Sequence, residues 1–430
     1  MKDLTKITEN RWLISWIVSA AIFGAMMLTL GTPKTSALWE INTTSPNFLD
    51  ARGITSAIES YRLGKDPLVE NPQDPFARPL NYPRVWLGLS QLGVDQTHTA
   101  LIGHGLVCFF LLGLLVFPPP DLDWLGIGLM LPVAFSPATL LGMERGNIDL
   151  LMFFLTAIGI AGVAAGKPAL RAMGIVSVML GFILKLYPLF ALAILLDESK
   201  RLFLRRIIWI SVVAGLYVSL TRHDLALIFQ TTPKSTGLSY GMNVMWMELA
   251  GHSRNLGIVA RLVAWTAVGT AAGLIWVGHR RGLGELRGIS LRNKSLIAFR
   301  AGAGVYGGTF LLGNNWDYRL IFLIFTLPLL ADLIQGGSPY LRRIAAIIVI
   351  GSVISCWHIT IYHVFHSLPF GSPACVILDE LANWTVFLGL SFLFGITLPR
   401  WRKTISPTAW TIAGVRANAA GSVPRINASN

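Results

Sequence analysis

The sequence predicts an all-α polytopic membrane protein, and three observations support this fold class. Of the 430 residues, 53% are hydrophobic and only 13% are charged, whereas soluble domains carry about 25% charged residues. The mean hydropathy is +0.59. Several apolar windows also reach the length of about 20 residues that a helix needs to cross a bilayer.

The first apolar window, Trp12 to Leu30, follows a short basic start and predicts a retained transmembrane helix. A secretory signal peptide begins in a similar way, but this window is long and no small-residue cleavage site follows it directly. Hydropathy predicts further spans near 99–117, 122–141, 147–165, 207–220, 256–277, 296–313, 318–334, 342–362 and 381–399.

Segment 172–196 is long for one helix, and Lys185 and Pro188 interrupt it. A single interrupted crossing places the basic cluster at 200–206 outside, whereas two short crossings place it inside with the later basic loops. Because cytoplasmic loops carry an excess of Lys and Arg, we favour two short crossings, which gives about twelve crossings with both termini cytoplasmic. This distribution explains the net charge of +13 without nucleic acid, for which no binding motif is present.

We expect one transmembrane domain over residues 1–404, with long outer loops at 31–98 and 221–255. Residues 405–430 are rich in Ala, Asn, Ser and Gly and predict a disordered cytoplasmic tail. The spacing of Cys108, Cys356 and Cys375 indicates neither a metal site nor a disulfide framework, so we expect three free thiols.

The first outer loop contains a predicted amphipathic helix that lies on the membrane surface. Ser45 or Asn47 is the expected cap. Asp50 falls in the first turn, where the helix dipole favours a carboxylate, so a capping role is the structural alternative to a catalytic one. The apolar residues at helical spacing are Phe48, Ile54, Ile58 and Tyr61.

Polar side chains from three later segments are expected on the same outer face. Ionisable residues beside apolar spans point by default to a functional site. The structural alternatives are a solvated turn at 144–145, an ion pair between Asp317 and Arg319, and a Lys185 side chain that reaches the interface. The polar residues concerned are Glu144, Arg145, Asn147, Asp149, Lys185, Tyr187, Asn315, Asp317, Tyr318 and Arg319.

These residue types suit a phosphate-bearing sugar substrate. Arg and Lys bind phosphate oxygens, Asn and Tyr hold sugar hydroxyls, and a carboxylate acts as general base on an acceptor hydroxyl. The three histidines His358, His363 and His366 lack a convincing metal-ligand spacing and are interpreted as core or interface residues. The composition therefore permits glycosyl transfer from a lipid-phosphate sugar.

Four stretches of the chain resemble the C-type membrane glycosyltransferases, and more narrowly glycosyltransferase family 87, the polyprenol-phosphate-mannose-dependent mannosyltransferases. They are FLDARGITSAIESYRLGKDPL, GMERGNIDLLMFFL, GFILKLYPLFALAILL and NNWDYRLIFLIFTLPLL. The resemblance implies a GT-C-like bundle. It also implies that Asp50 is the catalytic base, that Lys185 belongs to a K-x-Y-P-type stretch, and that Asp317 and Arg319 belong to a D-Y-R stretch.

The expected activity is inverting transfer of a hexose, mannose by resemblance, from a polyprenyl-phosphate sugar to a lipid or glycan acceptor. Lys185, Arg319 and Arg145 are the expected donor-phosphate ligands. The expected substrate contacts are Glu144, Asn147, Tyr187, Asn315, Asp317 and Tyr318. Arg145-Gly146-Asn147 stands where the family often begins a helix with an N-G-Q-type stretch.

We expect the protein in a bacterial inner or plasma membrane, in contact with its lipids and with the active site on the outer face. No cofactor is expected. No dense carboxylate cluster demands a metal, and the use of a divalent metal ion is left as an alternative. The alternatives are a transporter or flippase of a lipid-linked sugar and a non-catalytic scaffold. Charges clustered at the edge of the spans, and the lack of an internal repeat, favour an enzyme over a transporter.

Overall fold

The computed structural model describes residues 11–41, 43–119, 121–286, 292–369 and 371–401, of which those up to 398 belong to one compact unit. The expected tail at 405–430 lies outside the described residues. Helices dominate, as the composition predicts. The long helices are α2 (Arg11–Leu30), α5 (Thr99–Val116), α8 (Asp149–Ala164), α9 (Pro168–Lys185), α10 (Lys200–Leu220), α13 (Arg254–Arg281), α14 (Asn293–Leu312), α16 (Pro339–Phe365) and α17 (Gly371–Thr397).

Shorter elements connect these helices. The α-helices are α3 (Thr32–Ala37), α4 (Leu49–Arg62), α6 (Trp124–Ala134), α7 (Pro137–Arg145), α11 (Arg222–Thr231), α12 (Val244–His252) and α15 (Leu327–Gly336). The 3₁₀ helices are η1 (Arg84–Leu92), η2 (Gln96–His98), η3 (Tyr187–Asp197), η4 (Leu283–Leu286) and η5 (Asp317–Thr326). The two strands are β1 (Ser239–Tyr240) and β2 (Asn315–Trp316).

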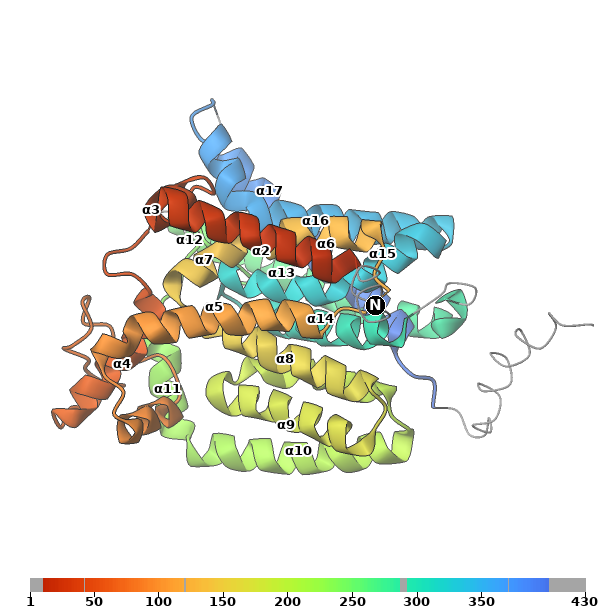
Figure 1. Cartoon of the computed structure of the whole chain (residues 1–430). Coiled ribbons are helices and arrows are strands. Elements are labelled where there is room, and N and C mark those ends of the chain that lie inside the picture. The colour runs from red at the N-terminus through yellow and green to blue at the C-terminus, as the bar shows by residue number, and fades with distance from the viewer. Residues whose placement is uncertain (1–10, 42, 120, 287–291, 370, 402–430) are drawn as a thin grey trace, which may run out of the picture. The chain divides into compact units, whose positions relative to one another are not determined.

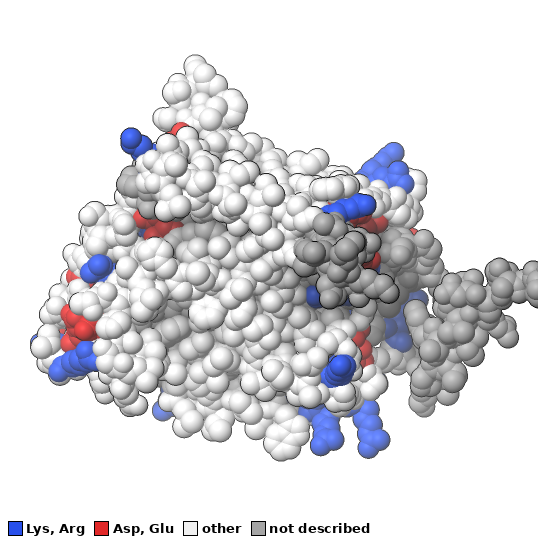
Figure 2. All heavy atoms as spheres, viewed as in Figure 1, with Lys and Arg blue, Asp and Glu red and all other residues white. Residues whose placement is uncertain are grey.

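The protein is membrane-embedded. Within the described residues, nine helical segments are long and apolar enough to cross a bilayer, or ten if α6 and α7, which meet at 48°, form one bent span. Figure 2 shows a broad face without charged side chains between two ends that carry Lys, Arg, Asp and Glu. α8 and η3 are apolar but shorter, so the expected count of about twelve crossings stays a prediction.

Segment 172–196 forms two helices that break near Lys185, as expected, rather than one interrupted helix. α9 ends at Lys185, and η3 begins at Tyr187 and packs back against α9. Leu186 joins them with a φ of 25°. Only η3 is short, however, because α9 begins at Pro168 and is long enough to span. Two further helices begin earlier in the sequence than the predicted spans 207–220 and 381–399, since α10 begins at Lys200 and α17 at Gly371.

We call the end of the bundle that carries α4, η1, α11 and α12 the loop end; it lies on the left of Figure 1. There α4 packs against α5, α7, η1 and η2, and its Ile54 and Ile58 are fully buried in protein. The expected cap at Ser45 or Asn47 is wrong: Phe48 precedes the helix in a left-handed conformation, and none of the described side chains caps it. Packing of the Phe48 ring close to Gly103 accounts for this start.

The segment 221–255 is built from α11, β1 and α12. β1 pairs antiparallel with β2, with Ser239 opposite Trp316 and Tyr240 opposite Asn315. Asn314 reinforces the pairing by donating its side-chain amide to the Ser235 carbonyl at 2.6 Å. The stretch that begins η5 is therefore held in place by the segment 221–255.

Aromatic packing joins the two elements that later meet in the candidate site. Phe153 of α8 stacks on Phe325 of η5 with ring centroids 4.3 Å apart, and Phe117 meets Phe325 edge-on at 4.8 Å. α5, α8 and α9 pack side by side around this core (Figure 1). The core holds the first turns of α8 against the last turn of η5.

Close packing of α14 on η3 depends on glycine. A Cβ atom at Gly304 would lie 2.5 Å from the backbone oxygen of Phe190 in η3, so any side chain forces the helices apart. Gly307, one turn further along α14, has open space at the corresponding position. We expect Gly304→Ala to lower the stability of the solubilised protein by about 1–3 kcal/mol through overpacking. Thermal unfolding in detergent measures this effect.

Gly307→Ala is the matched control in the same helix. It should be neutral or stabilising by up to about 1 kcal/mol, because alanine favours the helix and meets no neighbour. Equal melting temperatures for the two variants would contradict the close contact between α14 and η3.

Candidate active site

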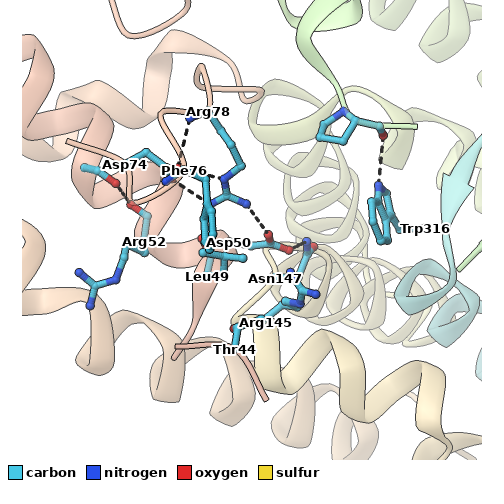
Figure 3. Close-up of polar contacts among 12 residues, drawn as sticks. Thr44, Leu49, Asp50, Arg52, Asp74, Phe76, Arg78, Arg145, Asn147 and Trp316 are labelled. Atoms are coloured by element: carbon cyan, nitrogen blue, oxygen red, sulfur yellow. Dashed lines mark hydrogen bonds and ion pairs between the residues drawn. The ribbon is translucent and has the colours of Figure 1, made fainter. Parts of the chain in front are cut away.

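Asp50 lies in the first turn of α4, where the sequence places it, and its side chain is 17% exposed. Asn147 donates its side-chain amide to Asp50 Oδ2 at 2.6 Å. The other oxygen, Oδ1, has Arg78 Nη1 at 3.9 Å, which is beyond hydrogen-bond distance. The carboxylate is therefore anchored through one oxygen (Figure 3).

Asn147 bridges the acid and a cation. Its Oδ1 accepts hydrogen bonds from Lys185 Nζ at 3.2 Å and from the backbone N–H of Asp149 at 2.8 Å. Asn147 is fully buried in the turn between α7 and α8. That turn needs Gly146, which has a φ of 57° and lies against Phe48. Asp50 and Lys185 are thus joined through one amide.

Asp149, 1% exposed, holds the buried part of the site together. Its carboxylate is 2.5 Å from Lys185 Nζ, accepts from the Tyr187 hydroxyl at 2.8 Å, and accepts from Arg319 Nε at 3.1 Å. Arg319 also donates to the side chain of Asn315. Buried charges persist when they are paired and hydrogen-bonded, and here two carboxylates, Asp50 and Asp149, face two cations.

A pocket of about 470 Å³ opens beside Asp50, and we call it the Asp50 pocket. Its lining includes Arg78, Arg145, Tyr82 and Tyr318, but neither Lys185 nor Arg319. Lys185 Nζ lies 5.0 Å from the Tyr82 ring and 5.9 Å from the Tyr318 ring. Both cations that the sequence favoured as phosphate ligands therefore lie outside the lining, where they pair with Asp149.

Arg78 is a pocket residue that sequence reasoning missed. It binds Asp74 through Nε at 3.1 Å and Nη2 at 2.9 Å, and Nη2 also donates to the Leu49 carbonyl at 2.9 Å. Burial opposes its charge, but the bonds to Asp74 prevail and raise the pKa of Arg78 above its usual value. The guanidinium thereby holds the proline-rich stretch to the start of α4. Arg78 is followed by a proline in a stretch without helical or strand periodicity, so the sequence pattern gives no sign of its role in the pocket.

Tyr82 lines the same pocket and was also missed. Burial raises the pKa of its phenol well above the usual range, and the nearby Asp50 carboxylate adds to this effect. The hydroxyl therefore stays protonated at neutral pH and is able to donate a hydrogen bond.

Glu144 and Arg145 do not form a solvated turn. Glu144 is buried and accepts from the backbone N–H and hydroxyl of Thr44 at 2.7 and 2.9 Å. Its Oε2 lies 3.3 Å from Arg145 Nε. Arg145 lines the Asp50 pocket, whereas Glu144 lines a different one.

The structural alternative of an ion pair between Asp317 and Arg319 is wrong. Arg319 pairs with Asp149, whereas Asp317 Oδ2 lies 3.3 Å from Nδ1 of His358 on α16. The other ring nitrogen of His358 contacts the Gly237 carbonyl at 3.0 Å. Asp317 is therefore part of a neighbouring buried contact, and the interpretation of His358 as a core residue is consistent with its 8% exposure.

Lys185 does not reach the interface either, since its side chain is 13% exposed and bound to Asp149. Tyr187 is likewise buried on Asp149. All three cysteines are free, as expected. Among the described residues no group of three or more His, Cys, Asp or Glu side chains is arranged to hold a metal ion, so no metal ligand is assigned.

Comparisons of the chain with protein-family models, with curated proteins and with solved structures give no match. Any function must therefore be inferred from the chemistry of the site.

Removal of the Asp149 charge tests the buried network. Asp149→Asn leaves Lys185 and Arg319 without their shared carboxylate, so we expect a loss of about 3–5 kcal/mol in stability. Adding Lys185→Met should restore part of the loss, with a coupling of about 0.5–3 kcal/mol, because one uncompensated charge is removed. Thermal unfolding of the single and double variants in detergent gives these values.

Glu70→Gln provides the control, because Glu70 pairs with Lys65 on an exposed surface at 2.9 Å. It should change stability by about 0–1 kcal/mol. If Asp149→Asn changed stability as little as Glu70→Gln, Asp149 would not hold the site together.

Proposed function

We propose that this protein is a membrane glycosyltransferase that transfers a hexose, with inversion, from a polyprenyl-phosphate sugar to a hydroxyl of a lipid or glycan acceptor. One observation carries the proposal. The Asp50 carboxylate lines the pocket, and within the described part of the chain one of its oxygens makes no hydrogen bond while the other is anchored through Asn147 to Lys185. This arrangement suits a general base beside a site where negative charge develops.

We assign the loop end to the outer face of the membrane, with both termini cytoplasmic. The distribution of Lys and Arg along the sequence supports this orientation. The resemblance to glycosyltransferase family 87 and to the C-type architecture supports the donor class and mannose as the first sugar to test. A polyprenyl chain would enter the pocket sideways from the lipid.

In the proposed reaction the acceptor hydroxyl enters the Asp50 pocket. Asp50 Oδ1 removes its proton while the oxygen attacks the anomeric carbon from the face opposite the phosphate. The new glycosidic C–O bond forms, the bond from the anomeric carbon to the phosphate oxygen breaks, and polyprenyl phosphate departs with the bonding electrons. The anomeric configuration inverts because attack and departure lie on opposite faces.

Arg145 is the proposed direct contact of the departing phosphate, because it lines the pocket and its side chain is 23% exposed. Lys185 and Arg319 act at longer range, since Asp149 already engages both. Together with Asp50 and Asp149 they carry no net charge, so the cluster becomes favourable to an anion once Asp50 has taken up the acceptor proton. Asn147 positions the base, and Tyr82 and Tyr318 offer hydroxyls to the sugar.

Consumption of substrate separates this proposal from the transport of a lipid-linked sugar. A transporter moves its cargo without breaking the glycosidic phosphate bond, whereas a transferase consumes the donor in detergent without any gradient. Purified protein with polyprenyl-phosphate mannose, glucose or galactose and a membrane-lipid extract as acceptor is the assay. Release of polyprenyl phosphate is the readout.

Asp50→Asn should lower the transfer rate by about 10²–10⁴-fold, the range for loss of a general base. Asparagine keeps the size and polarity of the side chain but cannot take a proton. The rate of polyprenyl phosphate release under donor saturation measures this loss.

Glu70→Gln changes a carboxylate in the same loop that does not line the pocket, and it should keep full activity. An unchanged melting temperature of Asp50→Asn would confirm that the loss is chemical. Near wild-type turnover by Asp50→Asn would remove Asp50 from the role of base.

Arg145→Gln should weaken donor binding by roughly 10–100-fold, because a hydrogen bond to a charged group is lost. The KM for the donor should rise more than the KM for the acceptor. Arg62→Gln is the control: Arg62 is an exposed arginine of α4 that donates to the Ser90 carbonyl at 2.9 Å. An equal rise of both KM values would show that Arg145 has a structural role instead.

A further inference from the structure

A second pocket, of about 510 Å³, lies across α4 from the Asp50 pocket, and we call it the Phe48 pocket. The start of α4 separates the two: Phe48 and Arg52 line one, and Leu49 and Asp50 line the other. The reacting carboxylate therefore does not line the Phe48 pocket. Its volume lies within the range of about 300–1,000 Å³ that is typical of small-molecule sites.

Aromatic rings form much of its wall. Phe23 and Trp39 meet edge-on with centroids 6.1 Å apart, and Phe48 meets His104 edge-on at 4.9 Å. Phe48 is held in place by Gly103, where a Cβ atom would lie 2.4 Å from its ring. Rigid ring faces of this kind suit a flat or ring-shaped ligand.

Hydrogen-bond donors and acceptors lie among the aromatic residues that line the pocket. Arg52 Nε and Glu144 Oε2 are buried and make no hydrogen bond within the described part of the chain. The guanidinium otherwise donates only a long bond of 3.3 Å to Gln96, and Glu144 Oε2 faces Arg145 Nε at 3.3 Å. Because both atoms are out of solvent contact, the polar groups open to a ligand are the exposed side chains of Asn47 and His104, which hydrocarbon would leave without a hydrogen-bond partner. The pocket therefore favours a polar ligand over a lipid tail.

The charges of the lining are compatible with a neutral ligand. Arg52 and Glu144 contribute one positive and one negative charge, so the lining has no net charge that a charged ligand would have to balance. Asn47 and His104, both exposed, add an amide and an imidazole. Donors and acceptors beside aromatic faces match the hydroxyls and the apolar ring face of a sugar.

The pocket also lies beside apolar surface. α2 and α5 contribute Phe23 and Val107 to the lining, and the same helices expose Ile22 at 57% and Leu101 at 71%. Both helices are long and apolar enough to span a bilayer. A ligand with a lipid tail would lay the tail along these helices while its headgroup occupies the pocket.

We propose that the Phe48 pocket binds the uncharged sugar headgroup of a membrane glycolipid. The inference goes beyond the proposed transfer reaction, because it depends on neither Asp50 nor a donor phosphate. It assigns the protein a second sugar site on the other side of α4.

Photolabelling of the protein in phosphatidylcholine nanodiscs tests the proposal. The probes are alkyl glucoside, mannoside and galactoside with a diazirine in the alkyl chain, and labelled peptides are mapped by mass spectrometry. We expect at least one probe to label peptides from α2, α5 or α7 saturably. The glycosyl diacylglycerol with the same sugar should compete about tenfold better than the methyl glycoside, since the tail adds buried apolar area.

Ala100 provides a matched pair of variants, because it is exposed and lines this pocket. Ala100→Phe should fill the mouth and reduce labelling about tenfold, whereas Ala100→Ser should keep it. Asp50→Asn should also keep it, because Asp50 lines the other pocket. If the protein is labelled saturably but transfers no sugar, the proposed function fails and this inference stands. If it transfers sugar but is not labelled, this inference fails and the proposed function stands.

Three outcomes would overturn the proposal. Non-saturable labelling by every probe would indicate bulk lipid rather than a site. Equal competition by phosphatidylglycerol would indicate a tail or an anionic headgroup. Equal competition by the methyl glycoside would assign the pocket to soluble sugars instead of glycolipids.

Discussion

The buried carboxylate of Asp149 is the contact on which the rest of the site depends. It collects Lys185 from the end of α9, Tyr187 from the start of η3 and Arg319 from η5. Paired charges away from water are stable only when geometry and hydrogen bonds are satisfied together. The positions of three elements are thereby tied to one side chain, and Asn147, two residues earlier, extends the connection to Asp50.

The start of α4 acts as a partition between two pockets of similar size. Its Phe48 is held in a left-handed conformation by packing on Gly103 and Gly146, and this turns Phe48 and Asp50 to different pockets. Arg78 secures the same turn by binding the Leu49 carbonyl. The partition is therefore fixed from both sides, which is consistent with the role of base proposed for Asp50.

The sequence was sufficient for the helical class, the position of most spans and the proximity of Asp50, Asn147 and Lys185. Hydropathy and charge are local signals, so they find spans and polar clusters. They do not identify partners between distant segments. Arg319 pairs with Asp149 rather than with its neighbour Asp317, and Arg78 reaches Asp74 and Leu49 from a stretch with no periodicity. Those choices depend on tertiary packing, as does the left-handed Phe48 that replaced the expected cap.

The order in which these partners leave the ribosome has a consequence for assembly. Tyr187 follows Asp149 by 38 residues, but Arg319 follows it by 170. At about 5–20 residues per second, Arg319 is synthesised roughly 10–30 s after Asp149. Before Arg319 is made, the nascent chain therefore contains two carboxylates of the site, Asp50 and Asp149, but only one of its two cations, Lys185. Completion of the site thus waits for late synthesis, and a truncated product lacking η5 would carry one carboxylate charge in excess of its cations in this cluster.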